Sequence, residues 1–284
     1  MQGRDRSGRE LLGCGSTDLQ GGGTGMQTFA RRQIGGVEIV FMDCTQHAFS
    51  KHTHDEFVIG VNTCGRKWIW LDRKVSEADE RDVTIYNPGE IQASHGFRQP
   101  WSLFSIAFEP RILEDVFGLR PERMFERTVH TQAGYAGLLR TVCGFALRSD
   151  ISDGEAAEAL AIALSPLVSV AEAGRGCAGR AMTPAIRRTA ERLRDCPGPL
   201  PCLTVLGRME GMTPVQLVRA FDKAYGLPPY AWLFNERLKE ARRLLASPMS
   251  LSDIAGALGF ADQAHLTRRF KAAYGVAPGL WRRG

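Results

Sequence analysis

Short apolar runs separated by turn residues fill the first part of this chain. Between residues 37 and 108 the runs VEIVFM, EFVIGV, KWIWL, VTIY and WSLFSIAF alternate with clusters of Gly, Pro, Asn and Asp. Runs of this length, rich in β-branched and aromatic residues and bounded by turn residues, are typical of strands. Many short strands at this spacing predict a sandwich or a small barrel.

The apolar period changes after the strand region. Ala- and Leu-rich segments at 135–148 and 155–172 place apolar residues three and four positions apart, as at Leu138, Val142 and Phe145. This spacing predicts two amphipathic helices. They could cover the barrel or form a contact between two copies of the chain.

The last third of the chain contains one pattern twice. The pattern L-x-R-x-F-x-x-A-Y-G-x-x-P-x-x-W runs from Leu217 to Trp232 and again from Leu266 to Trp281. Eight identities recur in register at an offset of 49 residues. Such self-similarity indicates a duplicated supersecondary unit.

Each copy predicts a helix with one buried stripe. Leu217 and Phe221 are four residues apart, whereas Arg219 falls on another stripe. Thr213 and Asp262 are the predicted N-caps, and a glycine, Gly226 or Gly275, is placed to end each helix. A shorter predicted helix precedes each copy and ends at Gly211-Met212 or Gly259-Phe260. The arrangement is a helix-turn-helix candidate.

Charge is unevenly distributed along the chain. Residues 180–284 contain 17 Lys and Arg against 8 Asp and Glu, whereas residues 1–179 contain 19 against 23. A basic C-terminal third attached to a mildly acidic body is typical of a nucleic-acid-binding module on a carrier domain.

Residues from about 184 to the end resemble the DNA-binding domain of AraC/XylS-type bacterial transcription regulators. The segments that carry the resemblance are PYAWLFNERLKEARRLL and SLSDIAGALGFADQAHLTRRFKAAYGVAPGLWR. The resemblance implies two helix-turn-helix units that bind double-stranded promoter DNA. The helix between them, predicted over 229–246, would be about 27 Å long, which suits recognition helices about 34 Å, or one DNA turn, apart.

Exposed residues early in each recognition helix are the candidates for reading bases. Arg can pair with guanine, Gln suits adenine, and Val or Ala can contact the thymine methyl group. Lys223, Arg269 and Lys271 are predicted phosphate contacts, and the repeated Tyr and Trp residues are predicted to pack beneath each unit. The predicted base-reading residues are Val215, Gln216, Val218, Arg219, Gln263, Ala264, His265, Thr267 and Arg268.

A second resemblance lies in the strand region. HTHDEFVIGV at 52–61 and YNPGEIQASH at 86–95 resemble the cupin-like effector-binding domain that precedes the DNA-binding domain in many AraC-type regulators. This implies a small-molecule effector inside the barrel. One strand is expected to run through the first motif, so that His52, His54, Glu56 and Val58 share one of its faces. The candidate effector-binding residues are His54, Glu56, Trp70, Gln92 and His95.

The metal-binding set of enzyme cupins is broken here. Val58 and Ile59 occupy the positions of the motif's Glu, and Gln92 takes the place of its later His. We therefore expect no catalytic residue, no metal and no cofactor. One alternative is a metal-dependent cupin enzyme fused to a DNA-binding module, which stoichiometric metal in the purified protein would favour. Another is an N-terminal domain that serves only for oligomerisation, which a thermal-shift screen against metabolites would separate from a sensor.

The expected organisation is multidomain α+β. A Gly-rich leader at 1–25 is predicted to be disordered, and Met26 is a candidate translation start. The cupin-like effector-binding and dimerisation domain spans 26–172, a linker 173–182, and the all-α double helix-turn-helix domain 183–284.

No run of 18 apolar residues occurs, and seven Cys lack CxxC spacing, so a cytoplasmic location away from membranes is expected. The expected partners are promoter DNA, an effector, RNA polymerase and a second copy of the chain, and the family favours activation.

Overall fold

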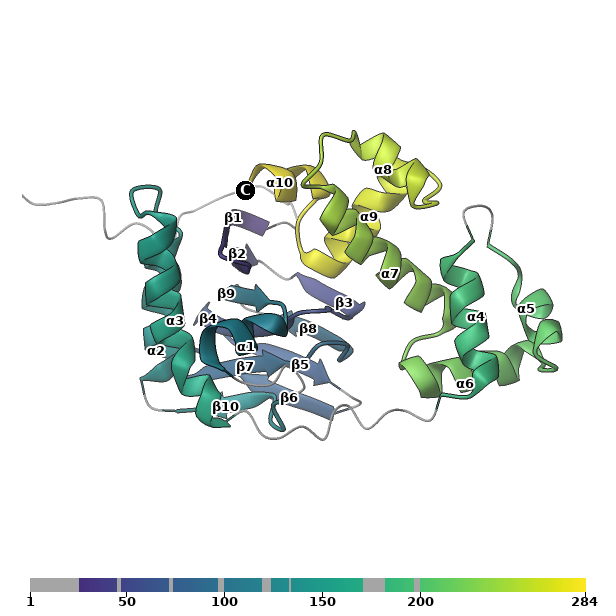
Figure 1. Ribbon diagram of the computed structural model, residues 1–284, viewed down its shortest axis with the longest axis horizontal. Coiled ribbons are helices and arrows are strands. Elements are labelled where there is room, and N and C mark those ends of the chain that lie inside the picture. Colours follow the sequence, from purple (N-terminus) through teal and green to yellow (C-terminus); the bar gives the residue numbers. More distant parts are fainter. Residues whose placement is uncertain are drawn as a thin grey trace, which may run out of the picture.

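Two antiparallel sheets make up the N-terminal half of the molecule (Figure 1). The computed structural model describes residues 26–44, 47–71, 74–96, 100–118, 124–132, 134–170, 182–196 and 200–284. The leader expected at 1–25 and the linker expected at 173–182, except Met182, lie outside these ranges. The expected domain boundaries therefore stay predictions.

The larger sheet has six strands in the order β1-β2-β9-β4-β7-β10, and the smaller has four in the order β3-β8-β5-β6. The strands are β1 (Met26–Ile34), β2 (Val37–Cys44), β3 (Ala48–His52), β4 (Phe57–Cys64), β5 (Lys67–Leu71), β6 (Lys74–Ala78), β7 (Asp82–Tyr86), β8 (Gln92–Gly96), β9 (Trp101–Phe108) and β10 (Val129–Thr131).

The larger sheet buries both of its faces. Ile39, Ile59, Ile85 and Ile106 lie opposite one another in register and are fully buried. They share a core with three helices, α1 (Arg111–Phe117), α2 (Tyr135–Ala146) and α3 (Asp153–Val170). Because successive side chains alternate, Val58 and its neighbours on the other face pack toward the smaller sheet.

The C-terminal half is entirely helical. Its helices are α4 (Pro184–Arg194), α5 (Leu203–Met209), α6 (Pro214–Tyr225), α7 (Pro229–Leu244), α8 (Leu251–Ala257), α9 (Gln263–Tyr274) and α10 (Pro278–Arg283). Helices α5 and α6 form one helix-turn-helix unit, α8 and α9 form the other, and α7 joins them. At 16 residues α7 is about 24 Å long, slightly shorter than predicted. The predicted fold class is confirmed.

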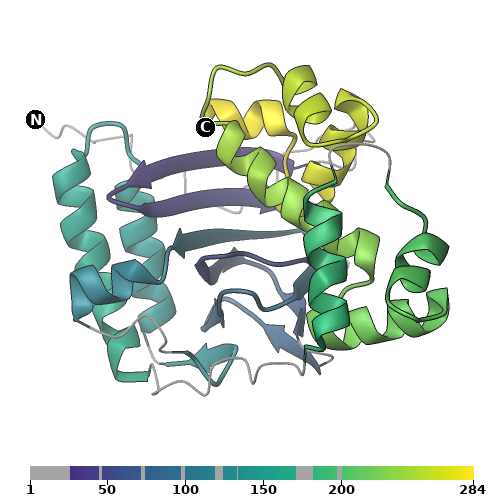
Figure 2. The ribbon, with the colours of Figure 1, turned by 45° about the vertical axis from the view of Figure 1, so that its right-hand side comes forward.

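The C-terminal helices lie on the side of the strands opposite α2 and α3 (Figures 1 and 2). The apolar core of the second unit is continuous with the barrel, because Val40, Met42 and Leu103 share a cluster with Leu266 and Phe270. Among the described residues, no helix is both long enough and apolar enough to cross a membrane.

One local prediction was wrong. The motif HTHDEFVIGV does not form a single strand, because β3 ends at His52 and β4 begins at Phe57. These two strands belong to different sheets, so the intervening residues must carry the chain from one sheet to the other. Strand alternation therefore does not set which way His54 and Glu56 point.

Candidate DNA-binding surface and effector cavity

Both recognition helices begin with side-chain caps. The Thr213 Oγ1 accepts a hydrogen bond from the backbone N–H of Gln216, and the Gln216 side-chain oxygen accepts one from the N–H of Thr213 at 2.9 Å. In the second unit Asp262 Oδ1 accepts from the N–H of His265 at 2.6 Å. Gly226, at φ 71°, and Gly275, at φ 84°, end the two helices as expected. The predicted caps are confirmed.

Most of the predicted base-reading residues lie on the surface. Val215, Gln216, Arg219, Gln263, Ala264 and Arg268 are exposed, and Val218, His265 and Thr267 are half-buried. Two of these residues also have internal partners. Gln216 completes the capping box, and the His265 ring packs against Phe234 and Phe260 with centroids 5.3 and 5.5 Å apart. These contacts reduce the freedom of both side chains to reach a base.

Basic residues of the helical half divide into two groups. Several are neutralised within the chain, since Arg188 and Arg192 pair with Glu210 and Arg194 pairs with Glu236. By contrast, within the described ranges Arg219, Lys223, Arg268 and Lys271 form no ion pair. Arg269 stacks on Phe234, with its Cζ 4.7 Å from the ring centroid. Both recognition helices therefore carry cations that form no ion pair within the described ranges, as do α4, α5 and α10 at Arg187, Arg208 and Arg283.

The repeated aromatic residues pack beneath each unit, as predicted, but the copies differ. Tyr225 and Trp232 stack on each other and on Phe221. Tyr274 and Trp281 do the same around Phe270, and they also line a cavity in the barrel. The second copy thus has a contact that the repeat pattern did not reveal.

That cavity lies between the two halves of the molecule. It measures about 80 Å³ and is lined from the barrel by residues that include Val40, Met42, Val58 and Leu103. Four further lining residues, Arg242, Ala273, Tyr274 and Trp281, come from the helical half. Among the described residues of the barrel, its charged lining residues are Glu38 and Lys67.

The five predicted effector-binding residues do not gather in one place. His54 and Gln92 line the cavity, and Glu56 lies beside it at the contact between the halves. Trp70 instead packs against the first helix-turn-helix core and beneath Lys51, whose Nζ is 3.9 Å from the ring centroid. His95 is exposed. Neither Trp70 nor His95 lines this cavity, because Trp70 packs against the helical half and the His95 side chain is exposed to solvent.

A chain of hydrogen bonds runs from the barrel to α7. His52 Nδ1 donates to the Ser50 carbonyl at 2.7 Å, and its Nε2 lies 3.0 Å from His54 Nε2. Since a neutral imidazole carries one proton, His54 Nε2 must be the donor to His52. His54 Nδ1 then accepts from Arg242 Nη1 at 3.3 Å.

Both imidazoles are held in the neutral form. Burial lowers the pKa of His52 to about 4, with a smaller contribution from the nearby Arg242 charge. Burial, followed by His52, Arg242 and Lys239, lowers the pKa of His54 well below its usual value. At neutral pH neither ring carries a charge next to the Arg242 guanidinium.

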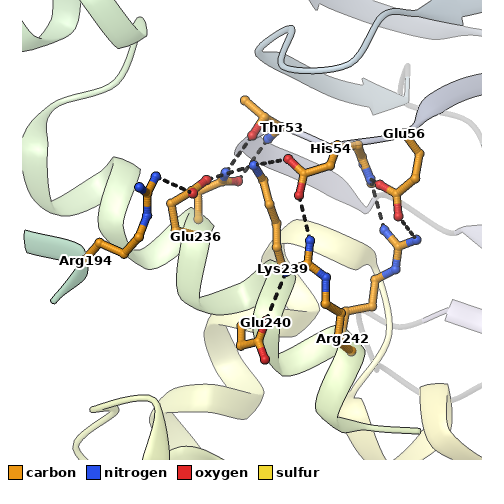
Figure 3. A network of polar contacts seen from close by, with 11 residues as sticks. Thr53, His54, Glu56, Arg194, Glu236, Lys239, Glu240 and Arg242 are labelled. Carbon is orange, nitrogen blue, oxygen red and sulfur yellow. Dashed lines mark hydrogen bonds and ion pairs between the residues drawn. The ribbon is translucent and has the colours of Figure 1, made fainter. Parts of the chain in front are cut away.

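Arg242 is the centre of the polar contact between the halves (Figure 3). Its Nη2 lies 2.7 Å from Glu56. It also lies 3.2 Å from Glu38, which pairs with Arg31 at 2.6 Å. Its Cζ lies 5.9 Å from the centroid of the Tyr274 ring. Arg242 is thus buried between two carboxylates and the aromatic residues of the second unit.

Two further contacts of α7 flank Arg242 (Figure 3). The Asn235 side-chain oxygen accepts from the N–H of Thr53 at 2.9 Å, and its amide donates to Thr53 Oγ1 at 2.7 Å. Lys239 and Arg243 pair with Asp55 at 2.7 and 3.0 Å. One face of α7 therefore forms hydrogen bonds and ion pairs with the 53–56 loop.

The sequence contained a signal for this face that was missed. Asn235, Leu238 and Arg242 recur at helical spacing, so two polar residues share a stripe with an apolar one. A polar residue on a buried stripe needs a partner, and here the partners come from the other half of the chain. Among the described residues no group of three His, Cys, Asp or Glu side chains is arranged to hold a metal ion.

Comparison with known protein families divides the chain into the same two parts, the barrel and the helical half. Residues 35–165 match the AraC-like ligand binding domain, and residues 206–284 match a helix-turn-helix domain. The chain belongs to the AraC/XylS family. Both matches lie within the segments that carry the sequence resemblance, and they cover the barrel from β2 onward and the helix-turn-helix units from within α5 onward.

Curated relatives of this AraC/XylS-family chain match a short segment of it. The transcriptional activator NphR of a Rhodococcus species is 35% identical over 82 residues, which are 28% of this chain and 24% of that protein. The regulator ExsA of Pseudomonas aeruginosa is 34% identical over 83 residues, 29% of this chain and 30% of ExsA. The matched segment thus spans less than a third of either relative.

Solved structures share the whole fold. ToxT of Vibrio cholerae O395 aligns over 87% of this chain and 97% of its own, with a TM-score of 0.53 and 10% identity. ToxT bound to an unsaturated fatty acid aligns over 88% and 96%, with a TM-score of 0.54 and 12% identity. The AraC/XylS-family chain and ToxT therefore have the same two-domain fold at low sequence identity.

Proposed function

We propose that this chain is a sequence-specific DNA-binding transcription regulator controlled by a small-molecule effector in the barrel. The observation that carries the proposal is the pair of capped recognition helices, each with an exposed and unpaired Arg at the equivalent position, Arg219 or Arg268. A helix of about 24 Å joins the two units, which suits two successive major grooves.

The recognition surface combines base contacts with phosphate contacts. Arg219 and Arg268 are placed to donate two hydrogen bonds to guanine, and Val215 and Ala264 to contact thymine methyl groups. Lys223 and Lys271 supply unpaired cations for phosphates. Because the residues before Arg219 and Arg268 differ between the copies, each chain would read an asymmetric site.

Control by the effector follows from the position of the cavity. Arg242 and Tyr274 line the cavity and belong to the helical half, so occupancy alters the same contacts that hold the halves together. A ligand that binds one arrangement of the halves more tightly shifts the population toward it. Activation through RNA polymerase is part of the proposal because NphR is named a transcriptional activator.

A second copy of the chain is the proposed partner of the α2–α3 hairpin. Leu138 on α2 is 41% exposed and Ile162 on α3 is 63% exposed. Burying these apolar side chains against an identical hairpin would remove their surface from water. A homodimer would also present four recognition helices to a repeated DNA site.

The substitution Arg268→Ala tests the proposed DNA contact. We expect a loss of about 1–3 kcal/mol in binding to the preferred site and relaxed preference at one base pair. The control is Arg127→Ala, which removes the same charge from an exposed position in the barrel domain. Equal weakening of specific and random DNA by Arg268→Ala would refute base reading by this residue.

A further inference from the structure

One buried cation on α7 lies between the cores of the two helix-turn-helix units. Trp232 and Leu233, near the start of α7, pack in the core of the first unit, and Leu238 and Ala241 pack in the core of the second. Arg237 lies between these two pairs along the helix and is 8% exposed. Burial lowers the pKa of its guanidinium, and among the described residues no carboxylate forms an ion pair with it. A buried cation without a carboxylate depends on its hydrogen bonds.

The hydrogen bonds of Arg237 reach both units. Its Nη1 donates to the carbonyl of Gly259 at 2.8 Å, and its Nη2 donates to the carbonyl of Cys196 at 3.3 Å. Gly259 lies in the turn between α8 and α9, three residues before Asp262, the N-cap of α9. Cys196 follows the C-cap of α4, a helix that packs in the core of the first unit. One guanidinium therefore ties the base-reading end of α9 to the first unit.

The turn of the first unit is tied to α4 in a different way. Glu210, directly before Gly211 in that turn, pairs with Arg188 and Arg192 of α4, and its side chain is 1% exposed. Both turns therefore make polar contacts with one helix, the first through ion pairs and the second through Arg237 at the end of α4. Helix α4 is thus a common reference for the start of each recognition helix.

The space around Gly259 shows how closely the guanidinium covers the second turn. A Cβ at position 259 would lie 2.9 Å from Arg237 Nη2 and 3.0 Å from its Cζ. Gly211 follows α5 as Gly259 follows α8, and both glycines have φ 66°. A Cβ at position 211 would meet nothing within 4 Å. The two turns therefore need the same backbone conformation, but only the second is covered by a side chain that joins the units.

We propose that Arg237 is a positioning residue that fixes the separation of the two base-reading helices, and so the number of base pairs between the two segments that one chain reads. The inference rests on the proposed function, because it concerns how the two proposed recognition helices are placed on DNA. One extra base pair between the segments moves the second by about 3.4 Å and turns it by about 35° around the duplex. Units tied through Arg237 cannot follow this change, whereas units joined by the packing of α7 alone can tilt toward it.

A series of duplexes with altered spacing tests the proposal. Each carries the two segments that the wild-type chain selects from a random library, with the separation changed by one base pair in either direction. We expect each change to weaken binding of the full wild-type chain by about tenfold or more, because the contacts of one segment are misplaced. This loss of affinity is the spacing penalty.

Substitutions of Arg237 separate positioning from general stability. Arg237→Met keeps the apolar stem and removes both donors, so we expect the same two segments to be preferred and the spacing penalty to fall to about threefold or less. Arg237→Lys keeps the charge but has one nitrogen in place of two, so its penalty should be intermediate. An unchanged penalty in Arg237→Met would overturn the proposal. So would loss of base preference at the second segment, which would indicate a general loosening of that unit.

A matched pair of glycine variants provides a second test. Gly259→Ala and Gly211→Ala add the same methyl group at the same φ of 66°, and only Gly259→Ala displaces the guanidinium. We expect Gly259→Ala to lower the spacing penalty as Arg237→Met does, and Gly211→Ala to retain it. Equal penalties in the two glycine variants would contradict the role of Arg237. If a thermal melt shows that Arg237→Met does not fold, this pair decides the question.

The wild-type chain separates failure of this inference from failure of the proposed function. If it selects no DNA sequence, the proposed function fails, whatever the variants do. If it selects two segments but binds them equally well at every spacing, the proposed function stands and the positioning role of Arg237 is wrong.

Discussion

The Arg242 guanidinium lies at the centre of the polar contact between the two halves of the molecule. Its neighbours are His54 in the 53–56 loop, Glu38 on β2, Glu56 and the Tyr274 ring on α9. Removing one partner of such a buried cluster leaves an uncompensated charge. The protonation state of each neighbouring group, above all of the two histidines, therefore affects the free energy of unfolding.

Acid should weaken this arrangement through the histidine pair. His52 has a pKa of about 4 in the folded chain and 6.5 when exposed, so the unfolded chain binds more protons between these values. The His52 contribution, about 3 kcal/mol, is therefore present in full above pH 6.5 and lost as the pH falls toward 4. The free energy of unfolding in denaturant at each pH measures this. His52→Gln should flatten the slope, and an unchanged slope in that variant would contradict the account.

The two helix-turn-helix units differ in their turns. The N–H of Met212 bonds to the carbonyl of Gly207, and the N–H of Phe260 bonds in the same way to that of Ala255. In the first unit Met212 is followed directly by the N-cap of the recognition helix. In the second unit one additional residue, Ala261, lies between Phe260 and the N-cap. In the first unit a Cβ at position 207 would lie 2.5 Å from the Met212 carbonyl oxygen, so the shorter turn requires glycine.

Gly207→Ala should therefore destabilise the first unit by about 1–3 kcal/mol, because backbone rather than a flexible side chain must move. The control is Gly256→Ala on α8, where an added Cβ meets nothing within 4 Å. We expect that change to be neutral or to stabilise by about 0.5–1 kcal/mol. Hydrogen exchange of the α6 and α9 amides reports each unit separately. Equal effects of the two substitutions would show that the turn does not restrict position 207.

Periodicity and capping residues were enough to predict the recognition helices α6 and α9 and their ends. Thr213 and Asp262 signal their caps locally, and the 49-residue repeat identified the packed aromatic residues. The cavity could not be predicted in the same way, because its lining joins residues from both halves. His54 and Gln92 were found from the cupin-like motifs. Lys67, Arg242 and Trp281 became visible only once the second unit was seen against the barrel.

At the scale of the whole molecule, one helix serves both halves. Helix α7 sets the spacing of the recognition helices and also carries Asn235, Lys239 and Arg242 to the 53–56 loop. The same rigid element therefore links the barrel to the geometry of the DNA-binding surface. A shift of α7 against the loop would move both units together, which is the physical route by which an effector could control DNA binding.

The central claim is that each chain reads DNA with two recognition helices in successive major grooves. Selection of bound sequences from a random duplex library tests it most directly. We predict two base-specific segments about 10 base pairs apart for each chain, one lost in Arg219→Ala and the other in Arg268→Ala. No enriched sequence, a single segment, or the same loss in both variants would contradict the account.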